Sequence, residues 1–91
     1  MSFQNNMFRP GAILHEVIAG ALRANGSSFQ EWVKNRGMSV TAVRNVTFGQ
    51  SAGPRSQALL DQLINDAGRE IVTVSYRIRM DAEAQKLAQV A

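Results

Sequence analysis

The first amphipathic segment covers residues 9–25. Its apolar side chains recur at spacings of one and three, which places them on one face of an α-helix. These residues are Ile13, Leu14, Val17, Ile18, Ala21 and Leu22. Pro10 suits the first helical position, and Gly26 supplies a stop after the last turn. His15 lies off the apolar stripe, so we expect its side chain to face solvent.

Two shorter helices are predicted over residues 28–36 and 40–48. Ser28 and Glu31 have the spacing of a capping box, in which each side chain binds a backbone N–H that the helix leaves unpaired. Gly37 ends the first of these helices. Its apolar face, which we expect in the core, consists of Phe29, Trp32 and Val33. The second helix points Val43 and Val46 inward and leaves other residues on its remaining faces: Thr41, Arg44, Asn45 and Thr47.

A fourth helix is predicted between Pro54 and Gly68. Pro54 follows a loop of small and polar residues and again suits a helix start. Gly68 follows the last apolar position and stops the helix. The apolar stripe between them consists of Leu59, Leu60, Leu63, Ile64 and Ala67.

The chain changes character over residues 69–80. Apolar and mostly polar residues alternate there and β-branched types are common, which indicates a β-strand. The alternating apolar positions are Val72, Val74, Tyr76, Ile78 and Met80. A helix that uses Ile71, Val74 and Ile78 is the alternative interpretation. The alanine-rich residues 81–91 are helix-prone.

Composition excludes several classes of function. The chain has 91 residues, enough for one core but not for a core and a roomy substrate cavity. It has no cysteine and a single histidine, and its carboxylates are scattered along the chain. We therefore expect no enzyme activity, no metal, no cofactor and no small-molecule effector. Because no apolar run approaches about 20 residues and the first ten residues lack the features of a signal peptide, we expect a cytoplasmic protein without a membrane partner.

Positive charge is concentrated in the middle of the chain. The net charge is +3, but residues 23–55 alone carry five basic residues against one acidic residue, a net charge of +4. The basic residues are Arg23, Lys34, Arg36, Arg44 and Arg55. A confined basic patch is the electrostatic footprint of a nucleic-acid partner. It is centred on the two short helices, and such a pair with a glycine in the turn between them is typical of a helix-turn-helix unit.

The stretch FQEWVKNRGMSVTAVRNVTFG, residues 29–49, resembles the phage repressor and Cro superfamily of helix-turn-helix DNA-binding proteins. Gly37 matches the turn, and Gly49 matches the glycine that often follows the recognition helix. The positions that match the inward residues of the two helices are Val33, Val43 and Val46. The next stretch, GPRSQALLDQLINDAG, looks like the following helix of that fold and is similar to the Ner-like phage regulators. Phe29 departs from the pattern, because many relatives have a phosphate-anchoring glutamine there; Gln30 lies next to it.

The resemblance covers about residues 10–68. It implies a mainly α fold, a compact lambda-repressor-like domain of four to five helices with a C-terminal extension. It also implies that the helix over residues 40–48 enters the major groove of double-stranded DNA. The expected base contacts are Val40, Thr41, Arg44 and Asn45. The expected phosphate contacts are Ser28, Gln30, Lys34, Arg36, Ser39 and Arg55.

A strand over residues 69–80 needs a partner, because isolated β pairs are marginal in water. The partner strand would come from a second subunit or from residues 1–8. We therefore divide the chain into a DNA-binding domain, residues 1–68, and a C-terminal dimerisation segment and tail, residues 69–91. The expected dimer interface consists of Val72, Val74, Tyr76 and Ile78. A symmetric dimer would place two recognition helices about 34 Å apart, as an inverted repeat requires.

The sequence thus predicts a homodimeric transcriptional regulator that binds an operator and represses, with activation of nearby promoters as a second activity. Two alternatives stay open. One is a helix-turn-helix module that docks on another protein as an antiactivator. The other is an excisionase-like accessory factor of recombination that bends DNA.

Overall fold

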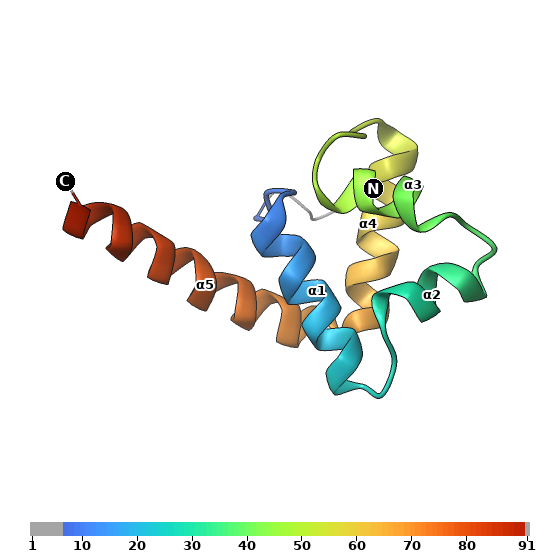
Figure 1. The fold of residues 1–91 in the computed structure, drawn as a ribbon, viewed down its shortest axis with the longest axis horizontal. Helices are drawn as coiled ribbons and strands as arrows, with labels where there is room; N and C mark the ends of the chain where they lie inside the picture. The colour runs from blue at the N-terminus through green and yellow to red at the C-terminus, as the bar shows by residue number, and fades with distance from the viewer. Residues whose placement is uncertain (1–6, 91) are drawn as a thin grey trace.

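A computed structural model describes residues 7–90 as an all-helical chain. The helices in this range are α1 (Ala12–Ala24), α2 (Phe29–Asn35), α3 (Val40–Thr47), α4 (Pro54–Ala67) and α5 (Arg69–Val90). Figure 1 shows α1 crossing α5, with α4 beside them and the shorter α2 and α3 on the side away from the C-terminus. The prediction of a mainly α protein is confirmed.

Capping serines mark the starts of α2 and α3, and a glycine forms the turn between them. Ser28 Oγ accepts the backbone N–H of Glu31 at 3.1 Å, and Ser39 Oγ accepts the backbone N–H of Ala42 at 3.0 Å, so each side chain caps the helix that follows it. The Glu31 carboxylate accepts the Ser27 hydroxyl rather than completing the predicted capping box. Gly37, with φ at +68°, provides the left-handed residue that turns the chain between α2 and α3.

One apolar core joins all five helices, and α1 lies at its centre. Leu14, Ile18 and Leu63 are among its fully buried side chains. Trp32 is buried as predicted. The segment before α1 also joins the core, since Phe8 packs edge-on against Tyr76 at 5.3 Å between ring centroids. The Arg9 backbone N–H donates to the Tyr76 hydroxyl at 2.9 Å, which ties this segment to α5.

The predicted strand over residues 69–80 is wrong, because these residues form the first half of α5. Val72 and Tyr76 lie four residues apart on one face of this helix and are buried in the core. Val74 and Ile78 lie four apart on another face and are exposed. Two apolar faces of a helix, offset by two residues, therefore produce the alternation that is typical of a strand.

The correction changes the surface predicted for dimerisation. Val72 and Tyr76 pack inside their own chain, whereas Val74 and Ile78 face outward. The core also continues past Gly68, the predicted boundary between the two parts of the chain. The alternative predicted partner strand is residues 1–8; residues 1–6 lie outside the described part of the chain, and Phe8 packs in the core without forming a strand. No helix within residues 7–90 combines the length and apolar character needed to cross a membrane.

Candidate nucleic-acid interface

Helix α3 has a buried side and an exposed side. Val43, Val46 and Thr47 are buried, whereas Thr41, Ala42 and Arg44 are exposed. Two of the predicted base-contact residues lie between these sides: Val40 is half-buried against the core, and Asn45 is half-buried. The exposed side therefore presents a hydroxyl, a methyl group and a guanidinium within one turn of helix.

His15 of α1 fixes the position of α3, contrary to the expectation that it faces solvent. Its ring packs against Phe29 and Phe48, each at 4.7 Å between centroids. Its Nδ1 lies 2.9 Å from Thr47 Oγ1. The Thr47 hydroxyl itself donates to the Arg44 carbonyl at 3.2 Å, so the neutral ring carries its proton on Nδ1 and donates to Thr47.

Further contacts hold the end of α3 against the start of α1. The backbone N–H of Gly11 donates to the Thr47 carbonyl at 2.8 Å. Gly49, with φ at +85°, approaches so closely that a Cβ there would lie 3.1 Å from the Pro10 Cβ. Thr47, predicted on an outer face, is fully buried between these contacts. Helix α3 is therefore attached to the core along its inner side and at its C-terminal end.

The charge of Arg44 acts on His15. Burial lowers the pKa of His15 below its ordinary value of 6.5, the positive charge of Arg44 lowers it further, and Glu16 opposes the shift. Burial and the nearby Arg44 charge therefore favour the neutral ring in the folded protein.

Arg44 is held in an orientation that leaves it on the exposed side of α3. Its guanidinium carbon lies 5.1 Å from the centroid of the Phe48 ring, a cation–π contact. Arg44, Asn45, Phe48 and Gln50 together line a shallow hollow at the end of α3. Because Arg44 makes no ion pair with any described residue, its donors are available to an acceptor outside the chain.

Arg36 has a structural partner, unlike the other predicted phosphate-binding cations. Its Nη2 donates to Asp66 Oδ2 at 2.8 Å, and its guanidinium lies 4.5 Å above the Trp32 ring. The same Asp66 oxygen accepts Trp32 Nε1–H at 2.9 Å. Arg36 therefore joins α2 to α4, and much of its charge is neutralised within the chain.

No family model, curated protein or solved structure matches this chain. What it does is therefore inferred from its own residues and their geometry.

The remaining phosphate-contact candidates differ in their surroundings. Gln30, Lys34 and Arg55 are exposed, and neither cation makes an ion pair among the described residues. Ser39 caps α3, whose first turn holds no acidic residue. Ser28 caps α2 beside the carboxylate of Glu31, which disfavours a phosphate there. The exposed cations of α2, α3 and α4 are thus Lys34, Arg44 and Arg55.

Sequence reasoning missed His15, Asp66 and Gln50. His15 lies at the edge of the α1 stripe, and a polar aromatic residue at such a border is the signal that could have identified it. Asp66 is 30 residues from Arg36, a pairing that no local pattern reveals. Gln50 follows α3 in the loop, where its backbone N–H donates to the Asn45 carbonyl at 2.8 Å.

Proposed function

We propose that this chain is a sequence-specific DNA-binding transcriptional regulator of the lambda-repressor-like helix-turn-helix type. It binds an inverted-repeat operator as a homodimer, with α3 in the major groove, and represses by occluding the promoter. The observation that carries the proposal is the division of α3 into a firmly attached inner side and an outer side with Thr41 and Arg44 free to meet bases. A helix that reads base edges needs both features.

The proposal gives the exposed residues different tasks. Arg44 donates to guanine O6 and N7, and Asn45 pairs with adenine N6 and N7, each worth about 1–3 kcal/mol of discrimination. Thr41 offers a hydroxyl and a methyl group to the neighbouring bases. Lys34 and Arg55, on the helices before and after α3, bind phosphates and fix the register without reading sequence.

Fluorescence anisotropy with two kinds of duplex tests this assignment. One is the sequence enriched by the chain from a randomised duplex pool, and the other is a scrambled duplex of equal length. Arg44→Ala and Asn45→Ala are expected to reduce the preference for the enriched duplex by about 1–3 kcal/mol each while retaining weak general binding. Lys34→Ala and Arg55→Ala are expected to weaken binding to the two duplexes equally. Each should also reduce the slope of log affinity against log salt concentration by about one.

Lys86→Ala is the matched control. Lys86 is an exposed cation near the far end of α5, so this variant removes the same charge and should leave DNA affinity unchanged. Unchanged discrimination in both α3 variants would refute the base-reading roles. Failure to enrich any sequence would refute the proposed function.

The same measurements separate the alternatives. Affinity for a protein partner through an apolar surface is expected to change little with salt, whereas phosphate contacts predict a steep fall. An accessory factor of recombination would bend its duplex, and a circular-permutation gel shift would then show mobility that depends on the position of the site.

A further inference from the structure

Helix α5 carries an apolar stripe that nothing in the described part of the chain covers. Ile71, Val74 and Ile78 are 46%, 53% and 63% exposed. Their spacing of three and four residues places them on one face, away from the face through which Val72 and Tyr76 enter the core. Large aliphatic side chains arranged in this way are typical of a helix that packs against another helix.

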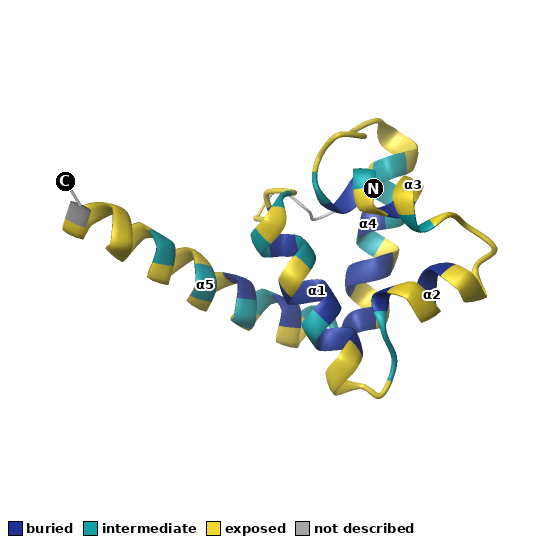
Figure 2. Ribbon diagram, in the orientation of Figure 1, coloured by how far each residue is buried: buried dark blue, intermediate teal, exposed yellow. Residues whose placement is uncertain are grey.

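The second half of α5 has little support from its own chain. The helix has 22 residues and is therefore about 33 Å long. Figure 1 shows it leading away from the other helices, and Figure 2 shows its distal part almost wholly exposed. Leu87 is 71% exposed there. A free helical segment shorter than about 12 residues is marginal in water, so this half gains from a neighbour that lies along it.

Most charged residues around the stripe already have partners in the chain. Arg69 pairs with Asp61, Arg79 with Glu16 at 2.9 Å, and Lys86 with Glu83 at 3.6 Å.

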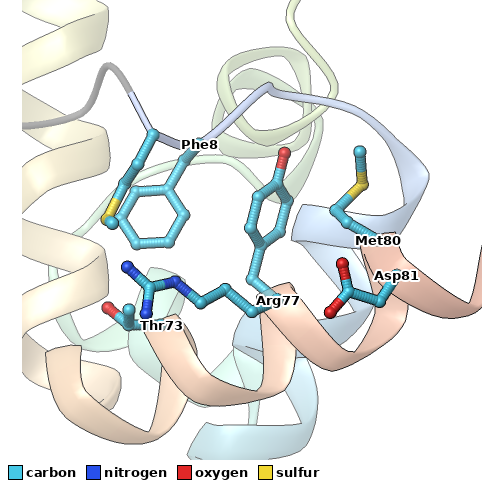
Figure 3. A pocket seen from close by; sticks show the side chains of 7 residues that line it. Phe8, Thr73, Arg77, Met80 and Asp81 are labelled. Carbon is cyan, nitrogen blue, oxygen red and sulfur yellow. The ribbon is translucent and has the colours of Figure 1, made fainter. Parts of the chain in front are cut away.

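Arg77 and Asp81 differ, as does Glu70 in the first turn of α5, because none of the three makes an ion pair with a described residue. Figure 3 shows Arg77 and Asp81 beside the cleft between Phe8 and α5, with the guanidinium of Arg77 turned toward Thr73 and away from Asp81. Arg77 and Asp81 thus present one positive and one negative charge that are unpaired among the described residues, four residues apart and next to the apolar stripe.

We propose that this face binds the same face of a second copy, with the two α5 helices antiparallel. A twofold axis near Arg79 then places Arg77 of each copy beside Asp81 of the other, and it brings the Ile78 side chains of the two copies near the axis. A parallel pair would place like charges opposite each other. The antiparallel pair also lays the projecting half of each helix along the first half of its partner, where Ile71 and Val74 are exposed.

This surface rests on the proposed function in one respect, because the homodimer is the form proposed to read an inverted repeat. The proposed interface differs from the four-residue interface expected from a strand. Both contain Val74 and Ile78, but the buried Val72 and Tyr76 are not part of the new one. It contains three further residues: Ile71, Arg77 and Asp81. The pairing of α5 is measured without DNA, so it can fail while DNA recognition stands.

Sedimentation equilibrium of the full chain over a concentration series tests the inference. The wild type is expected to show a monomer–dimer equilibrium. Ile78→Asp places a charge in the stripe and is expected to raise the dimer dissociation constant by roughly tenfold or more. Leu87→Asp is the matched control, since it makes the same kind of change on α5 but on a different side of the helix, and it should leave the constant unchanged.

Charge reversal tests the antiparallel arrangement. R77D and D81R are each expected to weaken the dimer, because each puts like charges together at both ends of the axis. The double variant R77D/D81R is expected to restore it.

A monomeric wild type, or an Ile78→Asp variant that dimerises normally, would overturn the proposed face. Failure of the double variant to recover, with helix content unchanged by circular dichroism, would overturn the antiparallel pairing. A monomer that still selects one DNA sequence would leave the DNA-reading role intact.

Discussion

His15 is the side chain through which α1 holds α3, and its replacement tests how firmly the reading helix is attached. Two variants separate its contributions. His15→Ala removes the hydrogen bond to Thr47 and the ring contacts with Phe29 and Phe48. His15→Phe removes the hydrogen bond but keeps an aromatic ring in the same place.

The contacts of His15 determine how much each variant should lower the free energy of unfolding. A hydrogen bond of this kind contributes about 0.5–1.5 kcal/mol, and an aromatic pair about 0.5–1.5 kcal/mol beyond its buried area. His15→Ala should therefore lower the free energy of unfolding by about 2–3 kcal/mol. His15→Phe should lower it by about 1 kcal/mol, because the Thr47 hydroxyl keeps its bond to the Arg44 carbonyl and is not left unpaired.

Urea unfolding followed by the fluorescence of Trp32, the one tryptophan of the sequence, measures these changes. The pH dependence of the free energy of unfolding provides a second test. The pKa of His15 is lowered in the folded state by burial and by Arg44, so the unfolded chain binds more protons between that lowered pKa and 6.5. The stability that His15 contributes is fully present above pH 6.5 and is lost as the pH falls through the folded-state pKa.

The difference in stability between wild type and His15→Phe should therefore be larger at pH 8 than at pH 5. A difference that is constant or grows toward low pH would refute the lowered pKa of His15 in the folded protein. A His15→Ala variant within about 0.5 kcal/mol of the wild type at pH 8, the range of an ordinary surface substitution, would refute the assigned contacts.

Three further substitutions test single features of the fold by urea unfolding. Asp66→Ala should cost about 1–3 kcal/mol, because the buried Trp32 Nε1–H loses its acceptor; stability equal to wild type would show that this bond contributes nothing. Gly20→Ala should stabilise by about 0.5–1 kcal/mol, since Gly20 lies within α1 and an added Cβ meets nothing within 4 Å; a loss of stability would contradict this geometry. Gly37→Ala should destabilise by about 1–2 kcal/mol, because its φ of +68° disfavours a residue with a Cβ; an unchanged midpoint would count against this turn.

The sequence predicted those parts of the fold in which one apolar stripe faces one core. Helices α1 and α4 have such stripes, and Pro54 and Gly68 mark the start and end of α4. Helix α5 was misassigned because it has two apolar faces. Burial of Val72 and Tyr76 in the core distinguishes its inner face from its outer one, and that burial is a tertiary property.

The division of α3 was predicted for a similar local reason. Val43 and Val46 are three residues apart and turn inward together, which leaves Thr41 and Arg44 outside. The attachment of α3 could not be predicted, because the His15–Thr47 contact joins residues 32 positions apart. Burial of Thr47 follows from that contact and not from its own residue type.

The positive charge of residues 23–55 also depends on a contact between residues that are distant in sequence. The sequence assigns residues 23–55 a net charge of +4, as if each cation in it faced the same partner. Asp66 lies outside this window in sequence but within 2.8 Å of Arg36 in space, so it neutralises one of the five cations. An ion pair that is about one-third exposed contributes little to stability by itself. Its consequence is positional: Arg36 is held between Trp32 and α4. The exposed cations of this window that make no ion pair with a described residue are then Arg23 in α1, Lys34 in α2, Arg44 in α3 and Arg55 in α4.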